Sequence, residues 1–385
     1  MPQRNHPYLI ALAFVLSVGS LAIWIVGWNA FWTSLGIPSM SPPFADMRTI
    51  QGALTTLAQG LDPTLTNPGD PWGRLMNYPK VWTFIASMLA FGNETHFIAY
   101  NLIVLIGFYG LCAHLIWRYP SKSLLLMIFS PACLLAVERG NNDLLVFILV
   151  TLFALLGNFK GLIAGAAAIA LKIYPVVLIP IAFVSKTRVI AWALTFSAIG
   201  ILWFNLADLS AIQKGNTANG DLAYGTTVAA TLAYRNLGAT HFYWDTVLYP
   251  LTISASLLFT QWLNLFGQLD RLRESDPLSV NLFYTGASVF FFTFILSSNW
   301  DYRLVYLLLL FPALSQIDLP VRWVRLLKIL LVVCGSYLWL AHYPYGWFVS
   351  GYAKVFVATL CGYLTLRTLL RESIETARRY FPSLA

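Results

Sequence analysis

Asp46 is the first carboxylate in this chain and a candidate for chemistry. It lies in the stretch PPFADMRTIQG, residues 42–52, shortly after a long apolar run, and Arg48 follows it two positions later. Only 10% of the residues are charged, so few carboxylates are expected to serve only as solvated surface residues. A carboxylate beside a substrate hydroxyl can take its proton as a general base. The alternative interpretation is that Asp46 is a solvated loop residue.

Three other polar segments also follow long apolar runs. They are ERGNND at 138–143, LKIYP at 171–175 and SSNWDYR at 297–303. Their candidate side chains are Arg139, Asn141, Asn142, Asp143, Lys172, Tyr174, Asp301, Tyr302 and Arg303. Lysine and arginine suit a phosphate, whereas carboxylates and amides suit sugar hydroxyls and proton transfer.

Each of these segments also has a simpler interpretation. RGNND could be a polar turn, because Asn and Asp favour turns. Lys172 could extend its side chain to the membrane surface. Asp301 and Arg303 could form a local ion pair within an interfacial aromatic anchor. The combination of segments therefore carries more weight than any one of them.

The composition indicates what kind of chain must position these groups. The 385 residues are 58% hydrophobic and include 14 Trp, and the mean hydropathy is +0.68. A soluble domain carries roughly 25% charged residues, so lipid must cover this chain, and we expect an all-α polytopic membrane protein. The net charge of +8 then belongs to cytoplasmic loops and not to nucleic-acid binding. The cysteines lie inside apolar runs, which predicts core residues without disulfides.

The apolar runs predict a bundle of about twelve membrane spans. The clear runs are 8–32, 96–117, 122–137, 142–157, 189–207, 247–267, 281–298, 302–316, 323–341 and 349–370. The basic clusters are RYPSK, SKTR, DRLR, RWVRLLK and RESIETARR. They share the cytoplasmic side if 78–92 lies on the outer surface and 161–184 is a helical pair that turns near Lys172 to Pro175. Both chain ends are then cytoplasmic.

We expect one integral membrane domain over residues 1–385. Its parts are a core at 8–207 with an outer loop at 33–95, a second outer loop at 208–246 and a C-terminal helical bundle at 247–385. The polar segments described above then all end on the outer face. Ionisable groups at membrane depth are costly and usually face a ligand, so this layout predicts one outward-facing cavity.

The order of short motifs along the chain resembles a known family. An Asp after the first span is followed by GLDP at 60–63, YP at 78–79, RGNND at 139–143 and KIYP at 172–175. This order is similar to that of the polyprenol-phosphate-sugar-dependent glycosyltransferases of the GT-C superfamily. It is most similar to the bacterial branch that includes the α-mannosyltransferases acting on phosphatidylinositol mannosides. The likeness covers residues 8–190 well and is looser from there to the C-terminus.

The resemblance implies a fold and a set of roles. The fold is a GT-C-like helical bundle with two surface helices in the first outer loop, here about 47–60 and 78–92. Asp46 holds the place of the family's general base, and Lys172 matches a family lysine near the donor phosphate. Relatives often carry a histidine where this chain has NWDYR, so either Asp301 takes its place or the substrate differs. Relatives also often have YPP where this chain has YPK.

We therefore expect a membrane glycosyltransferase of the cell envelope, with no cofactor and no metal. It would move mannose or another hexose from a polyprenyl-phosphate donor to a lipid or glycan acceptor, with inversion. The donor phosphate is expected at Lys172, Arg303 and Arg139. The sugar or acceptor is expected at Arg48, Asn141, Asn142, Asp143, Tyr174, Asp301 and Tyr302. The expected location is the bacterial cytoplasmic membrane, among membrane lipids, with the active site on the outer face.

Two other functions stay open. A transporter or lipid flippase would show internal repeats and charges at the bilayer midplane, and this sequence shows no such symmetry. A polysaccharide polymerase or ligase would use a large outer loop, which 208–246 could supply. The position of Asp46 straight after the first span argues against the polymerase or ligase, and the gathering of the charges at one face argues against the transporter.

Overall fold

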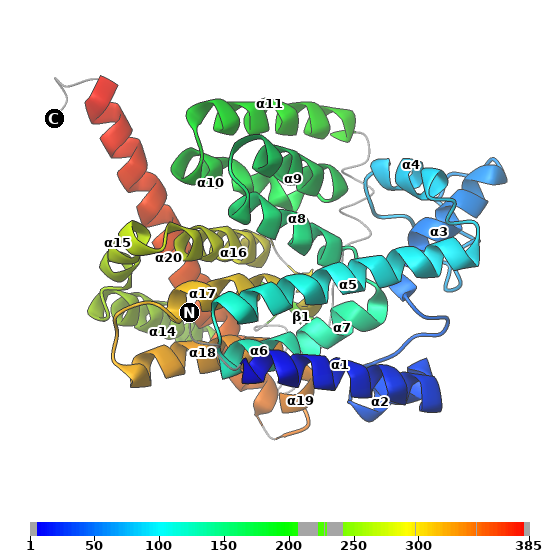
Figure 1. Ribbon diagram of the computed structural model, residues 1–385, viewed down its shortest axis with the longest axis horizontal. Helices are drawn as coiled ribbons and strands as arrows, with labels where there is room; N and C mark the ends of the chain where they lie inside the picture. Colours follow the sequence, from blue (N-terminus) through cyan, green and yellow to red (C-terminus); the bar gives the residue numbers. More distant parts are fainter. Residues whose placement is uncertain are drawn as a thin grey trace.

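Helices make up most of the chain. The computed structural model describes residues 6–206, 222–226, 228, 242–296, 298–343 and 345–380. Most of the expected outer loop at 208–246 lies outside these described residues. Helices satisfy their own backbone hydrogen bonds, which is required wherever lipid replaces water. Figure 1 shows the helices packed side by side in one bundle.

The first part of the chain runs through eleven α-helices and one short 3-10 helix. They are α1 (Pro7–Val26), α2 (Trp28–Ser34), α3 (Ala45–Ala58), α4 (Val81–Met88), α5 (Glu94–Arg118), α6 (Lys122–Ile128), α7 (Pro131–Arg139), α8 (Asp143–Leu155), α9 (Asn158–Leu171), η1 (Tyr174–Val177), α10 (Leu178–Ser185) and α11 (Arg188–Phe204).

The second part contains a short strand pair between helices. The elements are β1 (Ala223–Tyr224), α14 (Phe242–Trp262), α15 (Leu265–Ser275), α16 (Pro277–Ile295), β2 (Asn299–Trp300), η4 (Asp301–Leu310), α17 (Phe311–Leu314), α18 (Val321–Gly335), α19 (Tyr337–Leu340) and α20 (Gly346–Tyr380). The strands β1 and β2 are antiparallel, with Ala223 opposite Trp300 and Tyr224 opposite Asn299.

Four helices in the described residues are long and apolar enough to cross a membrane: α1, α5, α16 and Gly346–Thr376 of α20. Lys122–Arg139 and Asp143–Leu155 pass the same test only as a pair and are bent by 114° at their break, so the count is five if the pair is one broken span and four if it is a re-entrant loop. These lengths and compositions are those of an all-α membrane protein. Other expected spans are shorter helices here, such as Arg188–Phe204, so the figure of about twelve spans stays a prediction.

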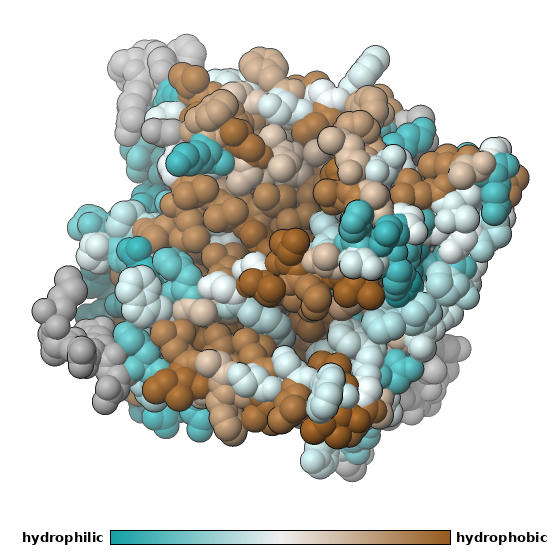
Figure 2. All heavy atoms as spheres, turned by 45° about the vertical axis from the view of Figure 1, so that its right-hand side comes forward, coloured by the Kyte–Doolittle hydropathy of each residue, from teal (hydrophilic) through white to brown (hydrophobic). Residues whose placement is uncertain are grey.

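The exposed surface is also that of a membrane protein. Figure 2 shows broad apolar areas on the face that it presents. On α1 and α11, large side chains such as Trp24 and Trp203 are 82% and 77% exposed. Soluble monomers rarely expose contiguous apolar patches larger than a few hundred Å², so lipid is the expected neighbour of these helices.

The basic loops meet at one end of the bundle. Arg118 pairs with Asp276 at 3.9 Å, and Arg273 pairs with Glu372 at 3.5 Å. Arg188 donates to the Thr376 hydroxyl. These contacts bring together four of the five basic clusters of the sequence or residues next to them, and the side of the membrane that they share stays a prediction. In Figure 1 this end lies at the left, whereas α3 and α4 lie at the right.

The expected helical pair over 161–184 is present. α9 ends at Leu171, the chain breaks at Lys172, and η1 with α10 runs back. Lys186, just after α10, donates to the carbonyl oxygen of Leu156, just before α9, at 2.6 Å. This contact brings the two far ends of the pair together, so the chain reverses direction at Lys172.

The first outer loop is packed tightly and carries two helices near the expected positions. These are α3 and α4, for which 47–60 and 78–92 were predicted. The segment between them lies against α3: Asn67 donates to the carbonyl oxygens of Thr49 and Arg74. A Cβ on Gly52 would lie 2.4 Å from the backbone nitrogen of Asp70, so no side chain fits between α3 and this segment.

The bend between α7 and α8 is built on Gly140. Its φ of 56° is left-handed, which glycine adopts without strain. A Cβ there would lie 2.6 Å from Asn101 Oδ1 and 2.8 Å from Phe44 Cβ. The bend leaves the following residues 141–143 fully buried, with their side chains inside the bundle.

The centre of the bundle is η4. All ten of its residues are buried, and it packs against α16, α7 and α8. A 3-10 helix longer than three or four residues is uncommon and often marks a functional segment. Its first residues, Asp301, Tyr302 and Arg303, lie at the end of the bundle opposite the basic loops.

Candidate functional site

Asp143 is the centre of a buried polar cluster. Its Oδ1 lies 2.9 Å from Lys172 Nζ, and its Oδ2 lies 3.3 Å from Arg303 Nε. The Tyr174 hydroxyl also donates to Oδ1, and it bonds the Tyr306 hydroxyl at 2.6 Å. The Asp143 side chain is fully buried, so its charge is balanced by protein groups alone. We call these five residues the Asp143 cluster.

Four of the five members of the Asp143 cluster lie at the end of an element, and Tyr306 lies within η4. Asp143 is the first residue of α8, where the helix dipole favours a carboxylate. Lys172 directly follows α9, and Tyr174 opens η1. Arg303 lies in the first turn of η4. Three segments that are distant in sequence, around residues 143, 172–174 and 303, thus meet at one point.

The strand pair fixes Arg303. Its Nη1 donates to the side-chain oxygen of Asn299, which lies in β2 opposite Tyr224 of β1. Its guanidinium carbon also lies 5.0 Å above the Tyr174 ring centroid. A guanidinium held by an amide and an aromatic face has little freedom to turn away from Asp143.

Asp46 lies beside this cluster and is joined to it by Asn141. The Asn141 amide nitrogen donates to Asp46 Oδ2, while its amide oxygen accepts from the backbone N–H of Asp143 at 2.8 Å. Asp46 Oδ1 lies 3.3 Å from Arg74 Nη1, and its side chain is 15% exposed, compared with 0% for Asp143. Of the two carboxylates, Asp46 is the one that a ligand can reach.

The site has a positive half and a negative half. Around Asp143, one carboxylate faces two cations, Lys172 and Arg303. Around Arg74, one cation faces two carboxylates, Asp46 and Asp70, at 3.3 and 2.8 Å. The excess of cations around Asp143 favours binding of an anion there. The excess of carboxylates around Arg74 favours a hydroxyl group that gives up its proton.

Two tyrosines complete the site, and sequence reasoning gave Tyr78 no role in it. Lys172 Nζ lies 5.5 Å from the Tyr78 ring centroid and 6.0 Å from that of Tyr302. Burial raises the pKa of the Tyr78 hydroxyl well above its usual value, and the charges of Asp46 and Asp143 raise it further. Tyr78 is therefore a neutral hydrogen-bond donor at neutral pH.

Asn142 is a buried residue of the site whose side chain lacks a hydrogen-bond partner among the described residues. It is 2% exposed, and neither its amide nitrogen nor its amide oxygen has a hydrogen-bond partner among the described residues. Leaving a buried amide unsatisfied costs about 1–3 kcal/mol. Such a group in a native fold calls for an explanation, and a bound ligand is one.

Three residues expected in the site make other contacts. Arg48 pairs with Glu94 at 2.6 Å and ties α3 to α5. Arg139 pairs with Glu138 at 3.0 Å and donates to the Pro38 carbonyl. Neither of these arginines contacts the Asp143 cluster directly.

The third is Asp301, which pairs with Lys354 of α20 at 2.7 Å; both side chains are 4% exposed. Lys354 Nζ also lies 5.0 Å from the Tyr337 ring centroid. Sequence reasoning missed Lys354, although it is the only charged residue in 346–366. A lone cation inside an apolar helix predicts a buried partner, and that signal was available.

The described residues contain no group of three or more His, Cys, Asp and Glu that could hold a metal ion. The carboxylates of the site are instead paired with cations and amides, as given above. Comparison of the chain with protein-family models, curated proteins and solved structures finds no match. Fold and site together define a helical membrane protein with a buried ion-pair centre at one end of its bundle.

Proposed function

We propose that this protein is a membrane glycosyltransferase that moves a hexose from a polyprenyl-phosphate donor to a lipid or glycan acceptor. One observation carries the proposal: Asn141 links a reachable carboxylate, Asp46, to a buried pair of cations around Asp143. A base and an anion site side by side are what the transfer of a phosphate-linked sugar needs.

The positive half of the site is proposed to bind the donor phosphate. Lys172 and Arg303 would contact the phosphate oxygens and favour the charge that builds up on them as the bond breaks. Arg139 has no part in this step, because Glu138 neutralises it. The unpartnered amide of Asn142 is proposed to bind sugar hydroxyls, together with Tyr78 and Tyr302.

The negative half is proposed to activate the acceptor. Asp46 takes the proton of the acceptor hydroxyl as the oxygen attacks the anomeric carbon. The bond from that carbon to the phosphate oxygen breaks, and its electron pair leaves with the polyprenyl phosphate. The products are an inverted glycoside, a polyprenyl phosphate and a protonated Asp46 that later releases its proton.

The membrane arrangement belongs to the same proposal. We place the site on the outer face of a bacterial cytoplasmic membrane and the basic end in the cytoplasm, with about twelve spans in total. The gathering of four basic clusters at the end opposite the site supports this orientation.

The test is sugar transfer by purified protein. Wild type, Asp46→Asn and Asp62→Asn are incubated with radiolabelled polyprenyl-phosphate mannose or glucose and a membrane lipid extract. Asp62 is the matched control, since it lies exposed in the same loop and its carboxylate bonds only Thr64 among the described residues. Loss of a general base costs about 10²–10⁴-fold in rate.

The outcomes separate the candidate functions. Transfer that Asp46→Asn loses and Asp62→Asn keeps supports the proposal and names the donor. Equal transfer by all three proteins removes Asp46 from the chemistry. Absence of transfer from every polyprenyl donor contradicts the proposal, and transport would then be the next function to assay.

A further inference from the structure

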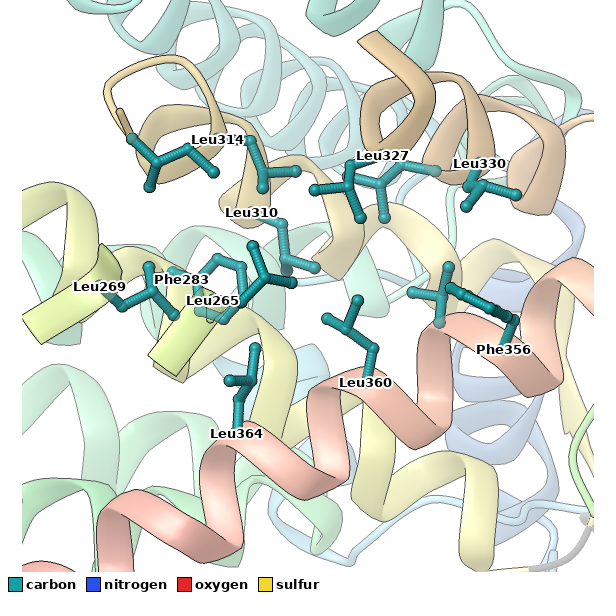
Figure 3. A pocket seen from close by; sticks show the side chains of 13 residues that line it. Leu265, Leu269, Phe283, Leu310, Leu314, Leu327, Leu330, Phe356, Leu360 and Leu364 are labelled. Carbon is teal, nitrogen blue, oxygen red and sulfur yellow. The ribbon is translucent and has the colours of Figure 1, made fainter. Parts of the chain in front are cut away.

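The apolar gap that Figure 3 shows between η4, α18 and α20 is hydrophobic core. Leu310, Leu327 and Leu360 are among the side chains that line it. The free space between them measures about 20 Å³, which admits about one water molecule and no larger ligand. A surface that suits a further ligand lies instead next to the polar site, at Trp300.

Trp300 is a half-buried aromatic residue that the fold holds in place. It lies in β2, where its backbone pairs with Ala223 of β1. The next residue, Asp301, donates its backbone N–H to the Leu222 carbonyl at 2.8 Å, and its carboxylate pairs with Lys354 at 2.7 Å. The strand pair and the ion pair therefore fix the backbone that carries the indole.

The Trp300 ring extends the aromatic surface of Tyr302. The two ring planes differ by 14°, and their centroids lie 6.2 Å apart, so the rings are nearly parallel and offset. An offset leaves part of each ring face free of the other ring. Tyr302 is only 8% exposed, whereas Trp300 is half-buried, so a ligand reaches the indole more easily than the phenol.

Tyr302 joins Trp300 to the reacting groups. Its ring centroid lies 6.0 Å from Lys172 Nζ, and the charges of Asp46 and Arg303 act on its hydroxyl. Lys172 is proposed to hold the donor phosphate, and Tyr302 is proposed to contact the donor sugar. The next ring on the same aromatic surface, that of Trp300, is then left for the acceptor.

A fixed aromatic face suits a sugar ring. The face of an aromatic ring carries partial negative charge, and the C–H groups on one side of a pyranose ring carry partial positive charge. A hydrocarbon chain gains as much from a leucine of similar area as from an indole, because its contact depends mainly on the apolar area that is buried. A requirement for an aromatic side chain at position 300 therefore distinguishes a sugar from a lipid chain.

We propose that Trp300 binds a sugar ring of the acceptor, so that the acceptor is a glycan or a glycolipid and not a lipid alcohol without sugar. This inference rests on the proposed glycosyl transfer. The acceptor extends from Asp46, where its hydroxyl reacts, along Tyr302 to Trp300. Trp300 determines which acceptor binds and takes no part in proton transfer.

The first measurement needs no donor. Full-length protein in dodecylphosphocholine, a detergent without a sugar headgroup, is mixed with methyl α-mannobioside or methyl α-maltoside. Saturation-transfer difference NMR then shows which sugar protons contact the protein. Wild type and Trp300→Phe should transfer saturation to ring C–H protons, and Trp300→Leu should lose most of this transfer. The matched control is Trp203→Leu, which removes an indole that is 77% exposed near the end of α11 and should change nothing.

The second measurement assigns the sugar to the acceptor. The donor is radiolabelled polyprenyl-phosphate mannose or glucose, and the acceptor is octyl mannoside, octyl glucoside or 1-octanol. Wild type should use an octyl glycoside and not octanol. Trp300→Leu should raise the KM for the glycoside about two- to tenfold, as the loss of one aromatic contact implies. The kcat and the KM for the donor should stay close to those of wild type.

Three results would overturn the inference. They are equal NMR signals from wild type and folded Trp300→Leu, transfer to octanol as efficient as transfer to the glycosides, and a raised KM for the donor alone. If wild type transfers no sugar but its NMR signals still depend on Trp300, glycosyl transfer is contradicted and the glycan site is supported. If Trp300→Leu does not fold, the choice that wild type makes between glycoside and octanol decides the question.

Discussion

At the scale of single residues, Asn141 decides how the site is held. Its amide group donates to Asp46 and accepts from the backbone of Asp143, so one side chain sets the spacing of two carboxylates. A leucine has a similar size and can do neither. Asp46 would then keep only Arg74 as a partner among the described residues.

Asn141→Leu should therefore lower activity and stability together. The lost hydrogen bonds are buried, so about 1–3 kcal/mol of unfolding free energy should disappear. Sugar transfer should fall because Asp46 is no longer oriented. Thermal unfolding in detergent and the transfer assay measure the two effects. Full activity in Asn141→Leu would show that Asp46 needs no such support.

The Asp143 cluster predicts an order of severity among variants. Asp143→Asn leaves two buried cations, Lys172 and Arg303, without their counter-charge, which costs about 3–5 kcal/mol. Lys172→Met should cost less, because Arg303 still pairs with Asp143. In Asp143→Asn with Lys172→Met, part of the loss should return. A double variant no more stable than Asp143→Asn would contradict this account.

The sequence could place some of these residues but not their partners. Grouping Asp46, Asp143, Lys172 and Arg303 was possible, because charge and topology put the ends of their helices on one side. The bridge through Asn141 has no signature in the sequence, since an amide in RGNND looks like any turn residue. Arg48 was expected in the site and pairs with Glu94 instead, a partner 46 residues away that the sequence does not indicate.

At the scale of elements, the pair Asp301–Lys354 ties α20 to the start of η4. Tyr302 and Arg303 follow Asp301 at the start of η4, so α20 helps to position Arg303 although α20 itself lies outside the Asp143 cluster. Asp301 and Lys354 are 53 residues apart in the sequence, so this ion pair is a long-range contact between the two elements. Lys354 is thus a positioning residue and not one that touches a substrate.

Lys354→Met should destabilise the protein by about 3–5 kcal/mol, because Asp301 is left buried and unpaired. The matched control is Lys328→Met, since Lys328 donates to the Ser315 hydroxyl and has no carboxylate partner among the described residues. Exchange of the two residues, Asp301→Lys with Lys354→Asp, should restore part of the loss. Equal melting temperatures of Lys354→Met and Lys328→Met would contradict the expected difference.

The long apolar runs predicted helices correctly but hid their breaks. The run that became α9, η1 and α10 shows its break in the sequence as KIYP, and the pair was predicted. The 114° bend at Gly140 was read as a loop between two spans. The helical periodicity and the hydropathy of the sequence do not distinguish a bend within one helical pair from a loop between two spans. The bend is held by the close approach of Gly140 to Asn101 and Phe44, both distant in sequence.

At the scale of the whole molecule, the bundle has a basic end and an end that carries the site. The four cysteines, Cys112, Cys133, Cys334 and Cys361, are buried. A new surface cysteine is therefore the group that a polar maleimide should label in the intact protein. This gives a direct way to find which end faces outward.

Leu65→Cys lies at the site end and Val321→Cys near the basic end, at positions 77% and 71% exposed. In intact cells a membrane-impermeant maleimide should label Leu65→Cys only. Val321→Cys should react after the cells are opened. Labelling of Val321→Cys alone in intact cells would reverse the proposed orientation, and wild type serves as the unlabelled control.

The length of α20 has a practical consequence. Its 35 residues make a rod of about 52 Å, whereas the hydrocarbon layer is about 30 Å thick. Figure 1 shows its last turns projecting past the other helices. A rigid reporter domain grafted in register onto these turns would therefore stand clear of a detergent micelle. It would give a 43.0 kDa chain the fiducial mass that alignment of single-particle images needs.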